Sequence, residues 1–287
     1  VQVEIQAPRD APRYVGRVID GVVSQSKTPD WMRERLRRCG LRSIGSIVDI
    51  TNYVMLELGQ PLHAFDLKEI KEKIVVRHSR KSETLDLLDG KSIQLTPETL
   101  MIADVDKPIG MAGIMGGMNS SIDKQTTSIM LEAAYFRPGA IARKAREYGI
   151  QSEASFRFER KIDPVHQRTA IERATQLICA SVGGNPGPVF QNASESHITT
   201  PNPITLRRSR LIKVLGLTIP DKQVKFILES LGMRVRHLKL GWKVLPPNWR
   251  TDVEEEHDLV EEVVRIYGYH NVPTRDPKSV IAYTPDR

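Results

Sequence analysis

A run of turn-forming residues divides this chain in its second half. Glycine and proline crowd into Gly184–Pro188 (GNPGP), and residues 194–203 again favour turns and extended chain over helix. Such clusters end regular secondary structure and mark loops between elements. The 287 residues also exceed a typical domain of about 100–200 residues. We therefore expect two domains, each of which buries its own core.

Composition restricts the class of protein. Hydrophobic residues make up 40% and charged residues 27% of the chain, which is typical of a globular protein and excludes a disordered or collagen-like one. No apolar run approaches the ~18–20 residues of a membrane span, and no secretory signal is visible at the start. The chain begins at Val1 without an initiator methionine, so we interpret it as a piece of a longer protein.

The numbers of cysteines and of charged residues indicate the cellular compartment and the kind of partner. The two cysteines, Cys39 and Cys179, are too few for a disulfide scaffold or a cysteine-rich zinc module, so free thiols in a reducing compartment are expected. Lys and Arg number 42 against 35 Asp and Glu, a net charge of +7. That balance suits a polyanionic partner, but it is equally that of an ordinary basic protein.

Local patterns predict strands and helices in mixture up to residue 183. Thr28 followed by Pro29 is typical of a helix start with the Thr28 hydroxyl as its cap, and Asp163–Pro164 predicts the start of a helix that ends at Gly183. The other patterns predict strands within 14–24, 73–125 and 128–134, a helix at 138–148 and a dense apolar, largely buried segment at 44–56. Together they predict an α+β fold with a mixed sheet.

The residues after the turn-rich stretch follow a different order. A short strand at 204–206 precedes a helix that ends at Gly216, and Pro220–Asp221 opens a helix that runs to Gly232. Strands at 233–238 and 242–245 and a final helix from about Glu254 to Tyr267 complete the pattern. This order resembles a small winged-helix-like α+β module.

Several polar residues lie in apolar surroundings. Glu132 interrupts the apolar strand 129–134, and a buried carboxylate is costly unless a group donates to it. Its partner is expected to be an arginine or a ligand. Thr51 and Asn52 must be hydrogen-bonded to the backbone or to a ligand. His63, in a segment that reads as a turn, is either a structural histidine or a functional one.

A glycine-rich stretch surrounds Ala112: Gly110, Gly113, Gly116 and Gly117. No Gly-Lys-Ser/Thr follows, so it is not a phosphate-binding loop, and it does not open a helix as a dinucleotide-binding motif would. Glycines allow the backbone to approach a neighbour closely. The stretch is either a ligand-contacting wall or a tight turn.

An acidic cluster lies near the start of the last helix. Asp258, Glu261 and Glu262 fall on one helix face, and Asp252 with Glu255 three residues later fits a capping box. Acidic residues are stabilising in the first turn of a helix. A capped helix therefore explains the cluster by spacing alone.

Six motifs, in order, carry a resemblance to a known family: Val48–Glu57 (VDITNYVMLE), Gln60–Asp66 (QPLHAFD), Gly113–Gly117 (GIMGG), Leu131–Ala134 (LEAA), Ser152–Arg160 (SEASFRFER) and Asp258–Val263 (DLVEEV). The chain resembles the bacterial phenylalanyl-tRNA synthetase β subunit over roughly residues 10–275. The resemblance implies an editing module at 1–200, a winged-helix-like module at 201–276 and, at 277–287, a linker toward a catalytic-like domain that this chain lacks. One departure is Arg42–Ser46 (RSIGS), where the family often has a proline and then an asparagine.

The resemblance implies a hydrolytic site for tyrosine wrongly esterified to the phenylalanine tRNA. Thr51, Asn52 and His63 would line the ester and water end, and Glu132 would meet the tyrosine hydroxyl. Ala112 and Gly113 would form close pocket wall, and Ser152 and Ala154 would lie beside the terminal adenosine. In the second module, the family's magnesium ligands correspond to Asp252, Asp258, Glu261 and Glu262, with the ion shared with an α subunit.

The resemblance also implies partners. These are tRNA(Phe) and the α subunit, in an α2β2 cytoplasmic ligase that uses ATP only as the full enzyme, with no membrane and no specific DNA. A basic group would face the tRNA, unless its members pair with nearby acids: Arg143, Lys144, Arg146, Arg157 and Arg160. The alternative for this chain is a tRNA-binding or subunit-assembly fragment without chemistry of its own.

Overall fold

Strand β10 (Ser128–Tyr135) shows how the first part of the chain is built. Its residues alternate between two hydrophobic cores: Met130 and Ala134 belong to one, Ile129 and Leu131 to the other. Successive side chains of a strand point to opposite faces, so β10 is buried on both sides. The sheet that contains β10 is therefore the middle layer of the first unit. This computed structural model describes residues 2–274.

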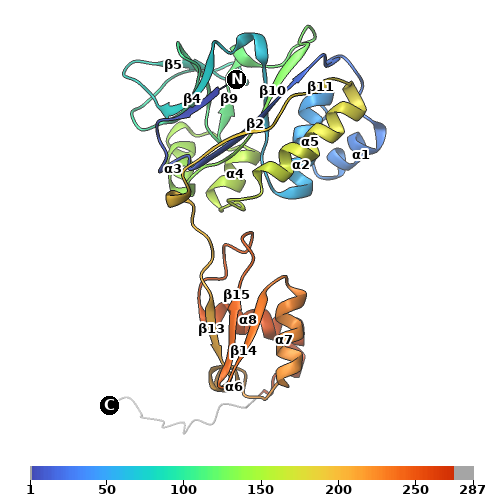
Figure 1. Ribbon diagram of the computed structural model, residues 1–287, viewed down its shortest axis with the longest axis vertical. Coiled ribbons are helices and arrows are strands. Elements are labelled where there is room, and N and C mark those ends of the chain that lie inside the picture. Colours follow the sequence, from blue (N-terminus) through green and yellow to red (C-terminus); the bar gives the residue numbers. More distant parts are fainter. Residues whose placement is uncertain (1, 275–287) are drawn as a thin grey trace, which may run out of the picture. The chain divides into compact units, whose positions relative to one another are not determined.

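Two sheets form the first unit, which ends at Thr200 (Figure 1). The sheet around β10 is antiparallel, in the order β11–β2–β10–β3, with β12 also paired to β2. Its other strands are β2 (Arg13–Asp20), β3 (His63–Asp66), β11 (Asn185–Pro186) and β12 (Phe190–Ala193). The second sheet is mixed, because β1 and β4 are parallel. Its order is β1 (Gln2–Ile5), β4 (Lys73–His78), β7 (Leu100–Ala103), β8 (Pro108–Met111) and β9 (Met115–Gly116), beside a hairpin of β5 (Thr84–Asp86) and β6 (Ser92–Gln94).

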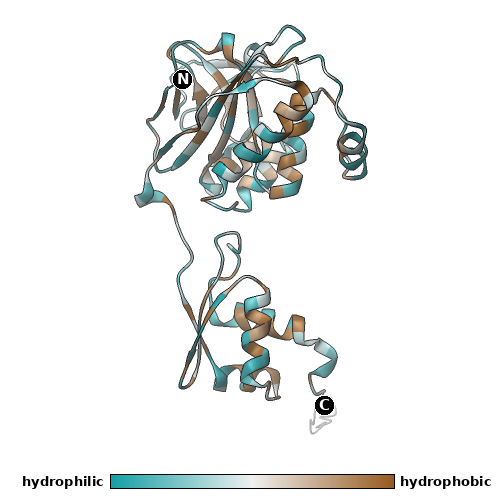
Figure 2. Ribbon diagram, turned by 45° about the vertical axis from the view of Figure 1, so that its right-hand side comes forward, coloured by the Kyte–Doolittle hydropathy of each residue, from teal (hydrophilic) through white to brown (hydrophobic). Residues whose placement is uncertain are grey.

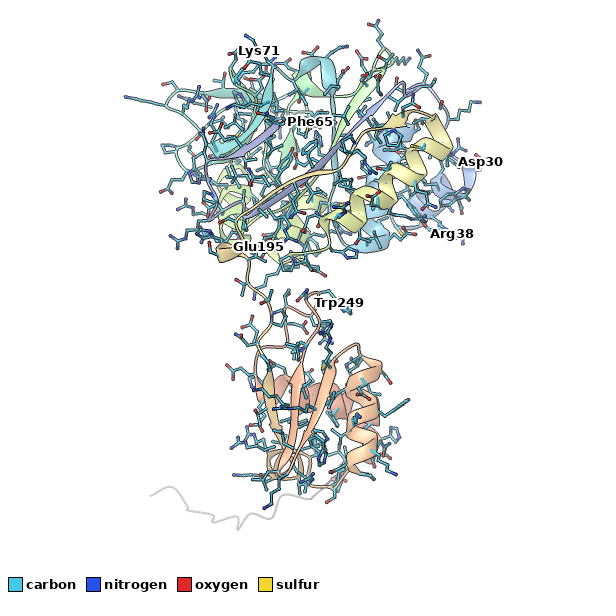
Figure 3. All side chains as sticks on the ribbon, viewed as in Figure 1. Asp30, Arg38, Phe65, Lys71, Glu195 and Trp249 are labelled. Carbon is cyan, nitrogen blue, oxygen red and sulfur yellow. The ribbon has the colours of Figure 1, made fainter. Side chains whose placement is uncertain are left out.

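Helices cover the antiparallel sheet on the face away from the mixed sheet. Helices α2 (Ser46–Leu58) and α5 (Gln167–Val182) pack on each other and on this sheet, and α1 (Asp30–Arg38) packs on α2. Helices α3 (Pro138–Tyr148) and α4 (Glu153–Glu159) add Ile141 and Phe158 to the core between the sheets. Three short 3-10 turns complete the unit: η1 (Leu67–Glu69), η2 (Met118–Ser120) and η3 (Glu195–His197). Phe65 lies inside the unit, whereas Asp30 and Arg38 lie at its surface (Figure 3).

The second unit has its own core around Trp242, Leu206 and Leu259. A three-stranded antiparallel sheet of order β13–β15–β14 packs on the helices, and the helices carry one hydrophobic and one hydrophilic face (Figure 2). The elements are β13 (Ile204–Arg207), α6 (Arg208–Leu215), α7 (Asp221–Ser230), β14 (Arg234–Leu238), β15 (Gly241–Leu245), α8 (Glu256–Tyr267) and η4 (Tyr269–Asn271). The α+β fold, with a mixed sheet and then a winged-helix-like order of elements, is confirmed.

Several local predictions need correction. Helix α1 begins at Asp30 without a side-chain cap, because the Thr28 hydroxyl donates to the buried Asp49 carboxylate instead. Helix α5 begins at Gln167, later than the Asp163–Pro164 signal. His63 starts a strand and does not lie in a turn. Helix α4 was not expected from the sequence.

Two further points concern the limits of the chain. The linker expected at 277–287 lies outside the described residues. No helix among the described residues combines the length and apolar composition that a membrane span requires.

Because the core of the second unit shares no residue with the other two cores, it should be possible to destabilise it selectively. Trp242 is fully buried, and we expect Trp242→Ala to lower the free energy of unfolding of this unit by about 3–5 kcal/mol. The mostly exposed Trp249 is the control, since Trp249→Ala should cost less than about 0.5 kcal/mol. Calorimetry should show a shifted transition for the second unit and an unchanged one for the first; equal shifts in both would contradict separate cores.

Candidate functional site

A pocket of about 390 Å³ opens between the two sheets of the first unit, next to helices α2 and α4. Most of its wall is apolar and includes Phe65, Met111 and Phe158. Pockets of roughly 300–1,000 Å³ with few polar groups are typical of small-molecule sites. All eight residues that the sequence assigned to a site in this unit line it: Thr51, Asn52, His63, Ala112, Gly113, Glu132, Ser152 and Ala154.

The two titratable residues of this set are cross-strand neighbours. In the antiparallel pairing of β10 with β3, Glu132 lies directly opposite His63. Side chains opposite each other have Cβ atoms about 4.5–5.5 Å apart and point to the same face. That face is the one to which Phe65 and Met130 contribute. The strand register therefore brings a carboxyl and an imidazole side by side at the pocket.

Glu132 is only 6% exposed. Its partner is not an arginine: the Tyr14 hydroxyl donates to Oε2 at 3.0 Å. Burial raises the pKa of Glu132 to about 7, although the hydrogen bond from Tyr14 acts in the opposite direction. The carboxyl therefore titrates near neutral pH, because the apolar wall disfavours its charge.

His63 is the second titratable group at the pocket. Its Nε2 atom is enclosed and has no hydrogen-bond partner among the described residues. Burial lowers the pKa of His63 to about 4, so the imidazole is neutral at pH 7. The ring contacts Phe65 edge-on, with 4.4 Å between centroids.

The glycines form a close wall against aromatic rings. A Cβ atom on Gly116 would lie 2.6 Å from Cε1 of His63, so only glycine leaves the imidazole in place. Gly113 has a φ of +67°, and a Cβ there would lie 2.9 Å from both Phe136 and Phe158. At these two positions the close approach expected from the sequence is present, and the neighbours are side chains of the pocket region.

The hydroxyl residues of the pocket are partly committed to the fold. Thr51 Oγ1 donates to the Val48 carbonyl within α2 at 2.8 Å. Ser152 caps α4, and its hydroxyl donates to the Ile114 carbonyl at 2.7 Å. The Asn52 amide has no hydrogen-bond partner among the described residues. Asn52 is therefore the polar side chain of α2 that is free to bind a ligand.

The basic group expected to face a polyanion is largely neutralised. Arg143 pairs with Glu98, and Arg157 pairs with Glu153. The other pairs are Lys144, a buried residue, with Glu147, and Arg160 with Glu159. Surface pairs of this kind screen the charge that a partner meets, so this group is weaker support for RNA binding than its sequence suggests.

Comparisons with known proteins agree on the family. Residues 10–183 match the family model of the B3/4 domain, and residues 204–269 match that of the tRNA synthetase B5 domain. Across 99% of its length the chain is 47% identical to the phenylalanine–tRNA ligase beta subunit of Pectobacterium atrosepticum. The chain belongs to the phenylalanine–tRNA ligase β subunit family.

A second relative of the family gives the same result. The chain is 48% identical over 98% of its length to the phenylalanine–tRNA ligase beta subunit of Vibrio cholerae. It spans 36% and 35% of the lengths of these two relatives, about a third of each. Among solved structures, an N-terminal fragment of the phenylalanyl-tRNA synthetase beta-subunit from Pyrococcus horikoshii matches with a TM-score of 0.43 and 15% identity, over 93% of this chain and 75% of that one.

The acidic residues in the part that matches the B5 domain do not converge on one point. Arg250 pairs with Asp252 at 2.6 Å and with Glu262 at 2.9 Å. Asp258 Oδ2 accepts the backbone N–H of Glu255 at 2.7 Å, so the capping box of α8 joins these two residues and the one expected between Asp252 and Glu255 is wrong.

This arrangement bears on the expected magnesium site. Within residues 2–274 no group of three or more His, Cys, Asp or Glu side chains is placed to hold a metal ion. Mg²⁺ takes oxygen ligands in near-octahedral geometry, usually one or two carboxylates and several waters, whereas Arg250 here pairs with Asp252 and Glu262. Asp252, Asp258, Glu261 and Glu262 therefore do not fit a magnesium site within this chain.

One residue that contacts the site, Tyr14, was not foreseen from the sequence. Its hydroxyl bonds to Glu132 from the core side through strand pairing, and Tyr14 is not among the residues that line the pocket. A tyrosine in a predicted buried strand indicates that its hydroxyl needs a partner, but the sequence does not say which. The register of β2 against β10 supplies the answer.

The displaced pKa values predict opposite effects of pH on stability. The pKa of Glu132 is raised to about 7 from its ordinary 4.5. Its carboxyl therefore contributes stability that is fully present below pH 4.5 and is lost as pH rises through 7. The pKa of His63 is lowered to about 4 from 6.5. Its imidazole therefore contributes stability that is present above pH 6.5 and is lost as pH falls through 4.

Glu132→Gln should remove the loss of stability with rising pH and keep the loss of stability with falling pH. Above pH 8 we expect this variant to be more stable than the parent by up to about 3 kcal/mol, since one pKa unit corresponds to ~1.4 kcal/mol. At pH 4.5 the two proteins should differ little. Urea unfolding between pH 4 and 9 checks this; a difference independent of pH would show that folding does not shift the pKa of Glu132.

Proposed function

We propose that the pocket hydrolyses the ester that joins tyrosine to tRNA(Phe). The observation that supports this most directly is the placement of Glu132. It is a buried carboxyl inside an apolar pocket, opposite His63, with a single hydrogen-bond partner among the described residues. The apolar wall suits an aromatic ring, and the free carboxyl oxygen suits a hydroxyl on that ring.

Selectivity follows from the cost of an unpaired polar group. A tyrosine phenol would donate to Glu132, whereas phenylalanine would leave that carboxyl desolvated and without a second partner. A site built to bond a hydroxyl rejects the analogue that lacks it by up to about 10⁴–10⁵-fold. The correct product would therefore be spared.

Hydrolysis of an ester requires a positioned water and little else. A water held in the pocket beside the His63 ring would attack the ester carbonyl carbon and release its proton to solvent. The bond to the ribose oxygen would break, and that oxygen would take up a proton from solvent. The low pKa of His63 favours orientation of the water over storage of its proton. Neither cysteine lines the pocket, so no covalent intermediate is proposed.

The function of the longer protein is proposed on the family alone. We propose that such a protein, with an α subunit in an α2β2 assembly, attaches phenylalanine to its tRNA in the cytoplasm with ATP. A magnesium ion shared with the α subunit is a prediction from the resemblance alone. Within this chain, Arg250 pairs with two of the expected ligands, Asp252 and Glu262. Specific DNA and a membrane are not expected as partners.

The test is single-turnover deacylation of Tyr-tRNA(Phe), with the chain in excess, at pH 7. His63→Ala should slow the reaction by about 10²-fold, since a reacting group that is misplaced by about 1 Å can cost that much. Glu132→Ala should slow it and also reduce the preference over Phe-tRNA(Phe). Both changes leave Asn52 and the glycine wall in place.

Matched controls lie outside the pocket. His78, which bonds to Asp10, and Glu147, which bonds to Lys144, contribute nothing to its wall. Deacylation at the parental rate by both pocket variants would show that the assignment is wrong. Binding of tRNA without any hydrolysis would instead favour a tRNA-binding or assembly fragment.

A further inference from the structure

Four strands place one residue each in a single row across the antiparallel sheet. Phe190 of β12 lies opposite Gly16 of β2, Gly16 lies opposite Glu132 of β10, and Glu132 lies opposite His63 of β3. The position beside Glu132 on β2 is therefore a glycine. A Cβ atom there would lie 2.5 Å from the Phe190 ring, so the ring fills the space and Gly16 offers no side chain to the carboxyl.

Tyr14 supplies the partner that Gly16 does not. It lies two residues earlier on β2, opposite Ala134, and so reaches Glu132 along the diagonal of the ladder. Its ring is fully buried in the core between the sheets. Its hydroxyl makes one hydrogen bond among the described residues, to Oε2 of Glu132.

A carboxylate has two oxygens and accepts about four hydrogen bonds. Tyr14 occupies one oxygen from inside the protein, and Oε1 has no partner among the described residues. The donated bond holds the side chain in one orientation and favours its ionised, accepting form. A tyrosine substrate would then present the same chemical group, a phenol, to the other oxygen.

We propose that Tyr14 is a positioning residue that holds the Glu132 carboxyl so that Oε1 faces the pocket and accepts the phenol of the substrate. The identity of the substrate in this proposal rests on the proposed function, whereas the hydrogen bond from Tyr14 to Glu132 does not depend on it. The titratable groups that face Glu132 are Tyr14 on β2, His63 on β3 and Glu153 at the start of α4, which is paired with Arg157.

The variant that tests this is Tyr14→Phe, which removes one oxygen and keeps the ring. Without the donated bond, the pH at which Glu132 ionises should rise by about one unit, because that bond stabilises the ionised carboxylate. The loss of stability with rising pH should move to higher pH by that amount. Deacylation of Tyr-tRNA(Phe) at pH 7 should fall about fivefold, because the ionised fraction of Glu132 falls from about one half to about one tenth, and it should recover as the pH is raised.

The matched control is Tyr148→Phe. The Tyr148 hydroxyl accepts the Thr96 N–H at 2.7 Å, away from the pocket, so its loss should lower stability equally at every pH. A second variant guards against simple misfolding: in a Glu132→Gln background, Tyr14→Phe should no longer change the pH dependence. If Tyr14→Phe behaves as Tyr148→Phe does, the proposal is overturned. If Tyr14→Phe shifts the pH profile of stability but the chain hydrolyses no ester, the proposed function is refuted and the coupling of Tyr14 to Glu132 stands.

An independent observation concerns the sheet of the second unit. Its inner face packs Leu206, Trp242 and Val244 into the core. The positions that alternate with these point to the other face and include no acidic residue: Thr205, Arg207, Arg234, Arg236, Leu238, Gly241, Lys243 and Leu245. Most acidic residues described in this unit instead lie at 252–262, around the start of α8, and Asp221 and Glu229 lie on α7.

Three cations on this outer face lack a counter-ion. Arg207 is neutralised by Glu256, but Arg234, Arg236 and Lys243 have no ion pair among the described residues. They line a surface hollow with Pro203 and Leu245, and Arg236 lies directly opposite Lys243. Like charges opposite each other destabilise a sheet, so this arrangement costs stability unless an anion is bound.

We propose that this outer face binds the phosphate backbone of RNA. Two guanidinium groups match phosphate oxygens in pairs, and the row of cations suits a chain of regularly spaced charges better than one carboxylate. RNA is favoured over DNA because the proposed function brings a tRNA to this chain.

The test is binding of tRNA(Phe) to the 287-residue chain at several salt concentrations. The triple change Arg234→Gln, Arg236→Gln and Lys243→Gln should weaken binding and lower the salt slope by about 2–3, since each neutralised phosphate contributes ~0.9 or less. The control removes the same charge from the helices: Lys213→Gln, Lys222→Gln and Lys225→Gln. Equal effects of the two triples, absence of binding at low salt, or preference for an acidic protein over RNA would overturn the proposal. Deacylation is measured separately, so failure of the pocket would be seen independently.

Discussion

The pairing of β10 between β2 and β3 is the constraint on which the pocket depends. In one register, Glu132 lies between Gly16 and His63, and Tyr14 reaches it along the diagonal. A shift by one residue would turn every side chain of β10 to the other face. Glu132 would then point into the core beneath helices α2 and α5. The apolar residues on both sides of Glu132 prevent this, because they must fill two cores at once.

Burial of polar groups at this point has a chemical consequence. The apolar wall moves the pKa of Glu132 up to about 7 and that of His63 down to about 4. Both shifts disfavour charge, and together they leave a neutral imidazole beside a carboxyl that changes its state near neutral pH. Such perturbed groups in a cleft are typical of functional sites. Here the physical cause is desolvation, only partly offset by the phenol of Tyr14.

The two units use charge in different ways. In the first unit, Lys144 of α3 and Arg157 of α4 are paired with acids of their own helices, and His63 at the pocket has a buried nitrogen without a hydrogen-bond partner among the described residues. In the second unit, acids gather near α8 while the cations of β14 and β15 stay unmatched. Arg250 illustrates how one side chain changes an interpretation: the family resemblance implied a common metal site for Asp252 and Glu262, and the guanidinium between them makes an ion-pair network instead.

Much of the architecture follows from sequence pattern. The turn-rich stretch near 184–203, the strand around Glu132 and the helix–helix–hairpin–helix order of the second unit are local signals, because periodicity and glycine or proline act over a few residues. The motifs also identified the pocket residues, all of which line one cavity. Helix α4, the start of α5 and the strand at His63 were missed, since tertiary packing overrides weak local preferences.

What the sequence by itself determined is therefore the inventory: a carboxyl among apolar neighbours, a histidine, a glycine run and an acidic helix start. What only the tertiary structure decided is which groups meet. Tyr14 and Glu132 are 118 residues apart, and their hydrogen bond exists because two strands pair in one register. Local pattern shows which face of a strand is buried, but the partner across the sheet depends on long-range pairing, which no short stretch of sequence encodes.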